Sequence, residues 1–256
     1  MSFRWWLADS IEMVKRNLRH IRRTPELLLD VTVQPIMFVV LFRFVFGGAI
    51  NTGGTSYVNF LMAGIFVQTI AFASIGSGYL LANDLQKGMI ERFRSLPMSQ
   101  SAVVTGRTLT DLLRGMLAVV VMTVVGLIIG FRPDGGLVAL LVGFAVLLLF
   151  GFALTWAGVA IGAGVRAPEA VQGVFFIAVF PLTFASSAFV PTNTMPTWLR
   201  AFAEHQPMTL TINAVRSFIL HGVPGPDAFG ALLWSLGILI VCFPLGLWLY
   251  YRRTTQ

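Results

Sequence analysis

The sequence has one cysteine, Cys242, and few charged residues. A single thiol cannot build a disulfide framework or a cysteine-based metal site, so we interpret Cys242 as a small buried residue. Charged residues make up 11% of the 256 residues, whereas hydrophobic residues make up 56%. One water-soluble core cannot enclose that much apolar surface. Since the bilayer requires internally hydrogen-bonded backbone, the composition predicts an all-α polytopic membrane protein.

Several catalytic motifs are also missing. The chain has no Gly-x-x-x-x-Gly-Lys-Ser/Thr phosphate loop, so by itself it cannot hydrolyse ATP by that route. Its three histidines, His20, His205 and His221, are far apart and have no accompanying His-Glu-x-x-His motif or carboxylate cluster. We therefore expect no catalytic, cofactor-binding or metal-binding residue on this chain. The 18 Lys and Arg residues are scattered through short loops, a distribution that disfavours nucleic-acid binding.

Six apolar runs predict six transmembrane helices. Each has about 20 residues or more, which as a helix crosses a hydrocarbon core of about 30 Å. The runs are Leu27–Ile50, Tyr57–Ala82, a stretch between Ala102 and Gly130, Leu137–Gly164, Val171–Val190 and Phe229–Tyr251. A further stretch, Met208–Val223, contains Asn213, Arg216 and His221 and is flanked by prolines. We interpret it as interfacial or re-entrant, not as a seventh span.

The basic residues predict the orientation. Thirteen of the 18 lie in the N-terminal segment, the loop between spans two and three, the loop after span four, and the C-terminus. That side is predicted to be cytoplasmic, with both termini there. Residues 1–25 show apolar positions at helical spacing between basic ones, which predicts an amphipathic helix in the membrane interface, with partner docking as the alternative. Residues 26–256 then form the transmembrane domain.

Polar residues in or near the predicted spans define two candidate sites. Arg107, Asp111 and Arg114 share one face of span three, either paired with other protein groups or lining a water-filled inward cavity. The external segment 191–227 is expected to form short helices. They would act as an outer gate, for which the candidates are Trp198, Phe202, Asn213 and Arg216, or simply as a cap over the bundle.

Two pairs of small residues indicate close helix packing. They are Ser74-x-x-x-Gly78 in the second span and Gly158-x-x-x-Gly162 in the fourth. Small residues at this spacing let two helix backbones approach each other in a membrane.

The loop between spans two and three is a short charged segment. Its charges alternate with apolar residues and Pro97 ends the pattern, which is typical either of an amphipathic helix that docks a partner or of an ordinary solvated loop helix. The chain resembles the ABC-2 type permeases, in particular their daunorubicin-resistance-like (DrrB-like) branch. The resemblance rests on QPIMFVVLFRFVFGGAI (Gln34–Ile50), ERFRSLPMS (Glu91–Ser99) and SSAFVPTNTMPTWLRAFAEHQPMT (Ser186–Thr209).

This resemblance implies a role for the charged loop. Residues 84–98 would be the coupling helix that docks into a separate ATP-binding subunit, which holds ATP and Mg²⁺. The docking residues would be Asp84, Lys87, Glu91, Arg92, Phe93, Arg94, Ser95, Leu96 and Pro97. Two permeases would pair, as a homodimer or as a heterodimer with a paralogue.

The function expected from the resemblance is that of an exporter half in a bacterial cell membrane. Surrounded by membrane lipids, it would move hydrophobic or amphipathic cargo, such as a drug, an antibiotic or a lipid-like molecule, out of the cell. The alternatives are a non-transporting scaffold or sensor and an ion-coupled carrier. Asp30 and Arg43 lie toward opposite ends of the first span, so neither resembles a midplane proton relay.

Overall fold

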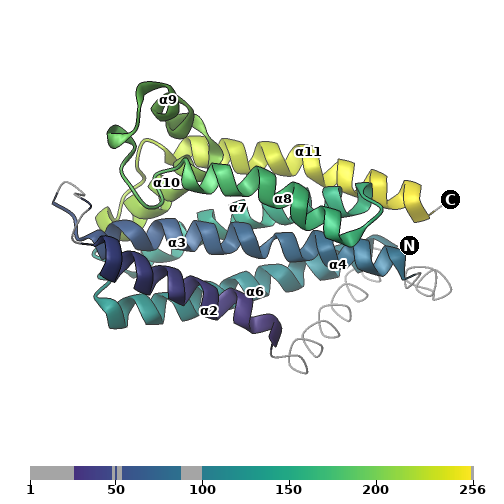
Figure 1. Cartoon of the computed structure of the whole chain (residues 1–256), viewed down its shortest axis with the longest axis horizontal. Coiled ribbons are helices and arrows are strands. Elements are labelled where there is room, and N and C mark those ends of the chain that lie inside the picture. The colour runs from purple at the N-terminus through teal and green to yellow at the C-terminus, as the bar shows by residue number, and fades with distance from the viewer. Residues whose placement is uncertain (1–25, 48–49, 51–53, 88–99, 255–256) are drawn as a thin grey trace.

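The computed structural model describes residues 26–47, 50, 54–87 and 100–254, with side chains from residue 33 in the first segment and from 105 in the last. These residues form helices joined by turns, without a strand. Most helices run side by side along the long axis, with α9 at one end and the C-terminus at the other (Figure 1). The elements are α2 (Glu26–Leu41), η1 (Phe42–Phe46), α3 (Tyr57–Ala73), α4 (Ile75–Gln86), α6 (Gln100–Ile129), α7 (Gly136–Gly164), α8 (Pro168–Phe184), η2 (Thr192–Thr194), α9 (Thr197–His205), α10 (Pro207–His221) and α11 (Ala228–Thr254).

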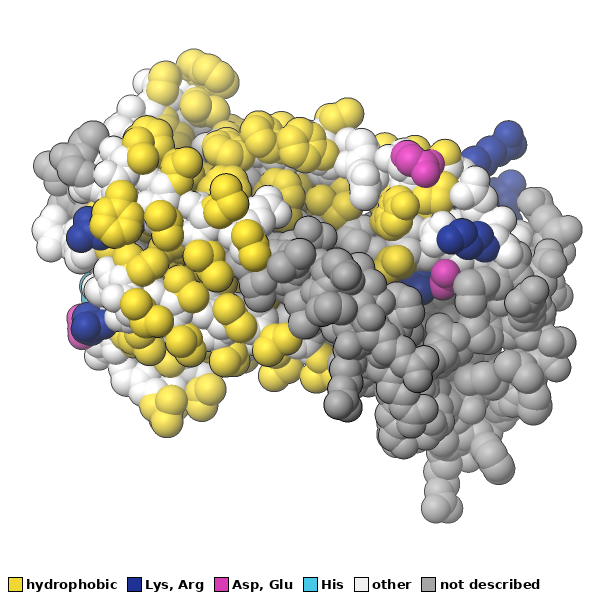
Figure 2. All heavy atoms as spheres, turned by 60° about the horizontal axis from the view of Figure 1, so that its bottom comes forward, with side chains coloured by type: hydrophobic (Ala, Val, Ile, Leu, Met, Phe, Trp, Pro, Cys, Tyr) yellow, Lys and Arg dark blue, Asp and Glu magenta, His cyan; other side chains and the backbone are white. Residues whose placement is uncertain are grey.

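The apolar exterior fits a protein embedded in lipid. Hydrophobic side chains cover the middle of the face in Figure 2, whereas the visible charged side chains gather toward its two ends. Large apolar residues such as Ile128, Ile177 and Ile240 are largely exposed. A soluble protein could not present so continuous an apolar surface to water. The described part of the chain therefore confirms the expected all-α, polytopic membrane class.

The predicted spans differ in length. Four helical stretches are long and apolar enough to cross a membrane: Tyr57–Gln86, Thr105–Ile129, Gly136–Gly164 and Ala228–Arg253. They correspond to the second, third, fourth and sixth predicted runs. The first run contains the shorter apolar helix Val33–Phe46, and the fifth run overlaps the shorter apolar helix Pro168–Phe184.

The fifth run ends its helix earlier than the predicted Val190. The Gln206 side-chain amide donates hydrogen bonds to the carbonyl oxygens of Leu182 (2.8 Å) and Ala185 (3.3 Å). These bonds satisfy carbonyl groups at the end of α8 that have no partner within the helix. The chain can therefore turn at Ala185 inside the bundle, where an apolar run alone predicts that the helix continues.

Helix α10 contains the stretch that was interpreted as non-spanning. Its 15 residues are about 22 Å long at the usual rise, which is too short for the hydrocarbon core. Pro207 begins the helix, the Gln206 side chain accepts a hydrogen bond from the Met208 amide, and Gly222 ends it with a left-handed φ of 75°. The helix packs against α3, α7 and α11. It is thus a short internal wall of the bundle end near α9.

The two predicted small-residue pairs pack against each other. A Cβ atom added to Gly78 of α4 would lie 2.8 Å from the carbonyl carbon of Gly158 in α7. One added to Gly162 would lie 2.9 Å from the Cα atom of Gly78. Real Cβ atoms do not approach other atoms so closely, so this contact between the backbones of α4 and α7 requires glycine. The packing prediction is confirmed.

Candidate functional site

A groove of about 720 Å³ opens between α2, α3, α4 and α8, and Arg114 of α6 contributes to its wall. Its volume lies within the range typical of small-molecule sites. Phe38, Phe72 and Phe176 supply aromatic surface. The polar side chains on the wall are Gln34, Gln68, Thr69, Tyr79, Arg114 and Gln172. Aromatic surface combined with a few polar groups suits an amphipathic ligand.

The Arg107, Asp111 and Arg114 stripe faces α4, and its three members have different surroundings. Arg107 forms an ion pair with Asp84 at 2.6 Å, and Asp111 accepts a hydrogen bond from the Ser77 hydroxyl. Arg114 lies 3.7 Å from the Asp111 carboxylate and lines the groove. Pairing with protein groups therefore describes Arg107 and Asp111, whereas Arg114 also borders open space. Sequence reasoning missed Asp84 and Ser77 as partners because they lie on another helix.

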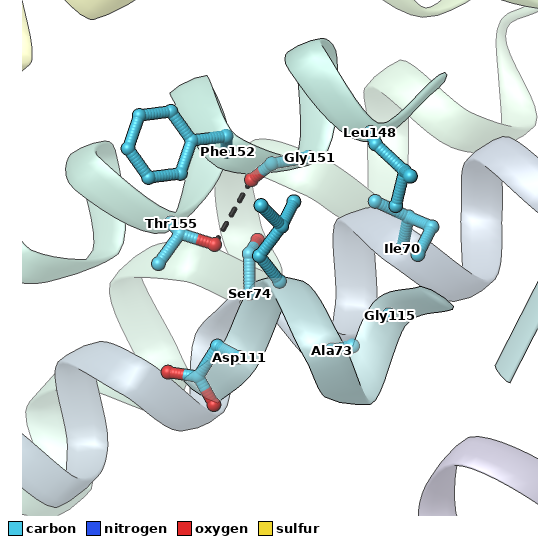
Figure 3. A pocket seen from close by; sticks show the side chains of 10 residues that line it. Ile70, Ala73, Ser74, Asp111, Gly115, Leu148, Gly151, Phe152 and Thr155 are labelled. Atoms are coloured by element: carbon cyan, nitrogen blue, oxygen red, sulfur yellow. Dashed lines mark hydrogen bonds between the residues drawn. The ribbon is translucent and has the colours of Figure 1, made fainter. Parts of the chain in front are cut away.

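Asp111 borders a second, much smaller pocket of about 20 Å³. In Figure 3, the oxygen atoms of Asp111 and Thr155 lie on one side of this pocket and the apolar Ile70 and Leu148 on the other. The Thr155 hydroxyl donates to the Gly151 carbonyl at 2.9 Å. A space of this size holds about one water molecule and is too small for cargo.

Arg216 is the centre of a polar network at the end of the bundle near α9. Its guanidinium donates to the carbonyl oxygens of Ser187 (2.7 Å) and Phe60 (3.2 Å) and to Oδ1 of Asn213 (2.8 Å). It also lies 3.8 Å from the centroid of the Phe60 ring. Asn213 donates in turn to Asp227 at 2.7 Å. The network joins α10 to α3, to the turn after α8 and to the turn before α11.

The four candidate gate residues therefore fall into two groups. Trp198 and Phe202 lie on α9 with 75% and 50% of their surface exposed, while Asn213 and Arg216 lie in the network on α10. Beside the exposed aromatic pair, Arg200 binds Glu204 at 2.7 Å. The hydrogen bond from Arg200 lowers the pKa of the Glu204 carboxyl.

A ladder of phenylalanine rings leads from the groove toward this end of the bundle. Phe176 borders the groove, and its ring centroid lies 4.8 Å from that of Phe180. Phe180 contacts Phe184 at 4.4 Å, and Phe184 contacts Phe189 at 5.3 Å. Phe189 stacks on Phe42 of η1 at 4.3 Å. The i, i+4 spacing of the α8 phenylalanines was visible in the sequence, but their continuation through Phe189 to η1 was not.

Of the expected coupling residues, the structure describes Asp84 and Lys87. Asp84 lies in the last turn of α4 and is held by Arg107, whereas Lys87 is exposed just after that helix. The remaining expected docking residues, Glu91 to Pro97, lie outside the described residues. So does the expected interfacial helix 1–25.

Long apolar helices around a groove with polar and aromatic walls define a multi-pass membrane protein with room for an amphipathic ligand. The family comparison identifies it as a transporter component: the chain belongs to the ABC-2 type transporter family, whose model matches residues 11–220. It is 35% identical to the daunorubicin resistance ABC transporter permease protein DrrB1 of Streptomyces coeruleorubidus, over 94% of this chain and 85% of that protein. It is 28% identical to the doxorubicin resistance ABC transporter permease protein DrrB of Mycobacterium tuberculosis, over 72% of this chain and 66% of that protein.

These relationships identify the chain as a permease subunit of an ABC exporter. They agree with the resemblance found in the sequence. They also favour an exporter over the scaffold, sensor and ion-coupled carrier that the residues alone left open.

Proposed function

We propose that this subunit moves hydrophobic or amphipathic cargo out of the cell, using ATP hydrolysed on a separate subunit. The groove between α2, α3, α4 and α8 is the observation that supports this proposal most directly, because it combines the size, aromatic surface and polar groups of an amphiphile site. Cargo would enter it from the cytoplasm or the inner leaflet. The phenylalanine ladder beyond Phe176 offers an apolar route toward the end near α9.

The proposed assembly contains two permeases and two ATP-binding subunits, with ATP and Mg²⁺ bound only by the latter. Each permease has six spans, with α2 and α8 as the shorter first and fifth. The end with the α7–α8 turn and the C-terminus faces the cytoplasm, which agrees with the basic residues near Arg166 and Arg252. The segment 191–227 then faces outward, where Trp198 and Phe202 of α9 would help to close the exit and the Asn213 and Arg216 network would hold α10 in place.

Alanine substitutions in the coupling segment are expected to weaken binding of the ATP-binding subunit. Glu91→Ala, Arg92→Ala and Phe93→Ala remove a charge or an apolar anchor from the proposed docking contact, and interface anchors of this kind are each worth about 1–2 kcal/mol or more. Co-expression followed by co-purification and drug-stimulated ATP hydrolysis measures the effect.

Membrane insertion of these variants should remain normal. The amount of each variant in the membrane fraction measures this. Arg166→Ala, in the turn between α7 and α8 and outside residues 84–98, serves as the comparison for loss of a single exposed charge. Wild-type association and stimulated hydrolysis in all three coupling variants would refute the docking assignment.

The proposed orientation predicts which loops an external reagent can reach. On a Cys242→Ser background, a cysteine at the exposed Thr194 of η2 should react with a membrane-impermeant maleimide added to intact cells. A cysteine at the exposed Ala167, in the turn between α7 and α8, should react only after the cells are opened. The opposite pattern would invert the topology and place the coupling segment on the side without ATP.

A further inference from the structure

We infer that the groove selects amphiphiles that have an anionic group and an aromatic or otherwise apolar body, in preference to equivalent cationic amphiphiles. The inference rests on the proposed function in one respect, namely that the groove is the cargo site. It goes further by assigning the charge of the cargo. The two relatives reported above are named for daunorubicin and doxorubicin resistance, and those names do not supply this assignment.

Arg114 is the first reason. Its side chain is only 12% exposed, yet among the described residues its guanidinium forms no hydrogen bond, and its Nε atom is buried without a partner. A guanidinium has five N–H donors in a planar fork that matches a carboxylate or phosphate. The Nε atom is closed off from the groove, so the donors available to a ligand there are those of the two Nη atoms, and a ligand that supplies oxygen acceptors to them would be stabilised. Arg114 lines the groove and can offer these donors to its contents.

Asp111 does not remove this capacity. Its carboxylate accepts a hydrogen bond from Ser77 and is 3.7 Å from Nη1 of Arg114. That distance permits electrostatic attraction but exceeds a hydrogen-bond length. Asp111 is also absent from the residues that line the groove and borders the small pocket instead. An anion in the groove would therefore meet Arg114 at a wall to which Asp111 does not contribute.

Among the described residues, the groove wall has no negative charge to attract a cation. The described residues that line it include amides and hydroxyls but no Asp or Glu. Gln68 is 5% exposed and forms no hydrogen bond within the described part of the chain, so its amide is a second donor for an anionic or carbonyl group. Glu169 lies in the exposed first turn of α8 and is not part of the wall.

The aromatic residues offer the strongest argument for the opposite preference. Phe38, Phe72 and Phe176 present ring faces or edges to the groove, and a ligand cation could bind a ring face. A phenylalanine ring, however, is equally suited to stacking on an uncharged aromatic body. A cation in this groove would also be repelled by Arg114, whereas an anionic amphiphile satisfies the arginine and the rings together.

Two probes with the same body test the preference. Wild-type permease in phosphatidylcholine nanodiscs is titrated with 1-pyrenebutyrate and with 1-pyrenebutylamine, and binding is followed by energy transfer from tryptophan to pyrene, with empty nanodiscs as blank. We expect the butyrate to bind at least tenfold more tightly than the amine. Equal affinities, or no saturable binding of either probe, would overturn the inference without recourse to any variant.

Three variants locate the preference. Arg114→Gln should weaken butyrate binding about tenfold and leave amine binding unchanged or tighter, and Arg114→Lys should keep most of the preference because it keeps the charge. Arg166→Gln removes an exposed positive charge from the turn between α7 and α8, outside the groove, and should behave as wild type. A preference that persists in correctly folded Arg114→Gln would also overturn the inference.

The titration needs no ATP-binding subunit, so it separates this inference from the proposed function. Selective butyrate binding without ATP-driven transport would retain the charge preference of the groove and refute the proposed function. ATP-driven transport in proteoliposomes with no charge preference would retain the proposed function and overturn the inference.

Discussion

Gly162→Leu is expected to prevent α4 and α7 from packing and to leave little folded protein. The backbones of the two helices touch at Gly78 and Gly162, where even a Cβ atom would come within 2.9 Å of the opposing Cα. Backbone atoms cannot rotate away as a side chain can, so the helices would have to separate. Overpacking usually costs about 1–3 kcal/mol and sometimes more. A larger cost is expected here, because the displaced α7 also packs against α3, α6, α8, α10 and α11.

Thermal unfolding followed by size-exclusion chromatography in detergent measures this effect. At the lower limit of about 3 kcal/mol, the midpoint of unfolding would fall by roughly 6–12 °C for a chain of this size. Gly237→Leu is the matched control, because nothing lies within 4 Å of a Cβ added to that residue of α11. Leucine also favours a helix more than glycine does, so the control should be neutral or slightly stabilising. Similar losses in both variants would mean that the glycine contact is unimportant.

This contact shows what the sequence could predict. Pairs of small residues four positions apart within apolar runs predicted that α4 and α7 each pack closely against another helix. Apolar run length also predicted the long helices, and the polar residues and flanking prolines of Met208–Val223 predicted that α10 does not span. These properties are local, because they depend on the spacing and composition of one segment at a time. That Gly78 would meet Gly158 and Gly162, and not another helix, required the tertiary arrangement.

The groove shows what the sequence could not predict. Its wall combines residues from five helices, and most of them, including Gln68, Tyr79 and Gln172, belong to no motif. Arg114 was singled out only as a member of a charged stripe. The division of that stripe, with Arg107 and Asp111 bonded to α4 and Arg114 also facing the groove, depends on side-chain positions that helical periodicity does not determine. The early end of α8 likewise depends on Gln206, which is more than 20 residues away in the sequence.

The polar residues of α10 make the same point. Asn213 and Arg216 are too polar for a simple span, and they are gate candidates because they belong to the predicted external segment 191–227. Their partners are main-chain carbonyls, the Ser187 hydroxyl and one aspartate from separate segments. A carbonyl group is present at every residue, so no sequence pattern marks Ser187 or Phe60 as the one to be contacted. In the structure, Asn213 and Arg216 connect helices, while Trp198 and Phe202 are exposed on α9.

Arg216→Met is accordingly expected to destabilise the bundle strongly. The substitution keeps a long apolar stem but removes the donors that satisfy the carbonyl groups of Ser187 and Phe60 and the Asn213 side chain. Leaving a buried acceptor unsatisfied costs about 1–3 kcal/mol. The Ser187 carbonyl lies in a turn, whereas the Phe60 carbonyl lies within helix α3. Loss of the hydrogen bond to Ser187 should therefore account for most of the destabilisation. We expect a total of about 3 kcal/mol, seen as a fall of roughly 6–12 °C in the unfolding midpoint.

Two comparison variants show whether the fork of donors is responsible. Arg216→Lys keeps the charge, but one ammonium cannot replace the planar guanidinium at two carbonyls and an amide, so it should recover only part of the stability. Arg200→Met removes an arginine from exposed α9, where the pair with Glu204 should contribute little to stability because solvent screens it. If Arg216→Met unfolds at the same temperature as Arg200→Met, the network does not hold α10 against α3. The four gate candidates would then have to be considered as one mobile unit.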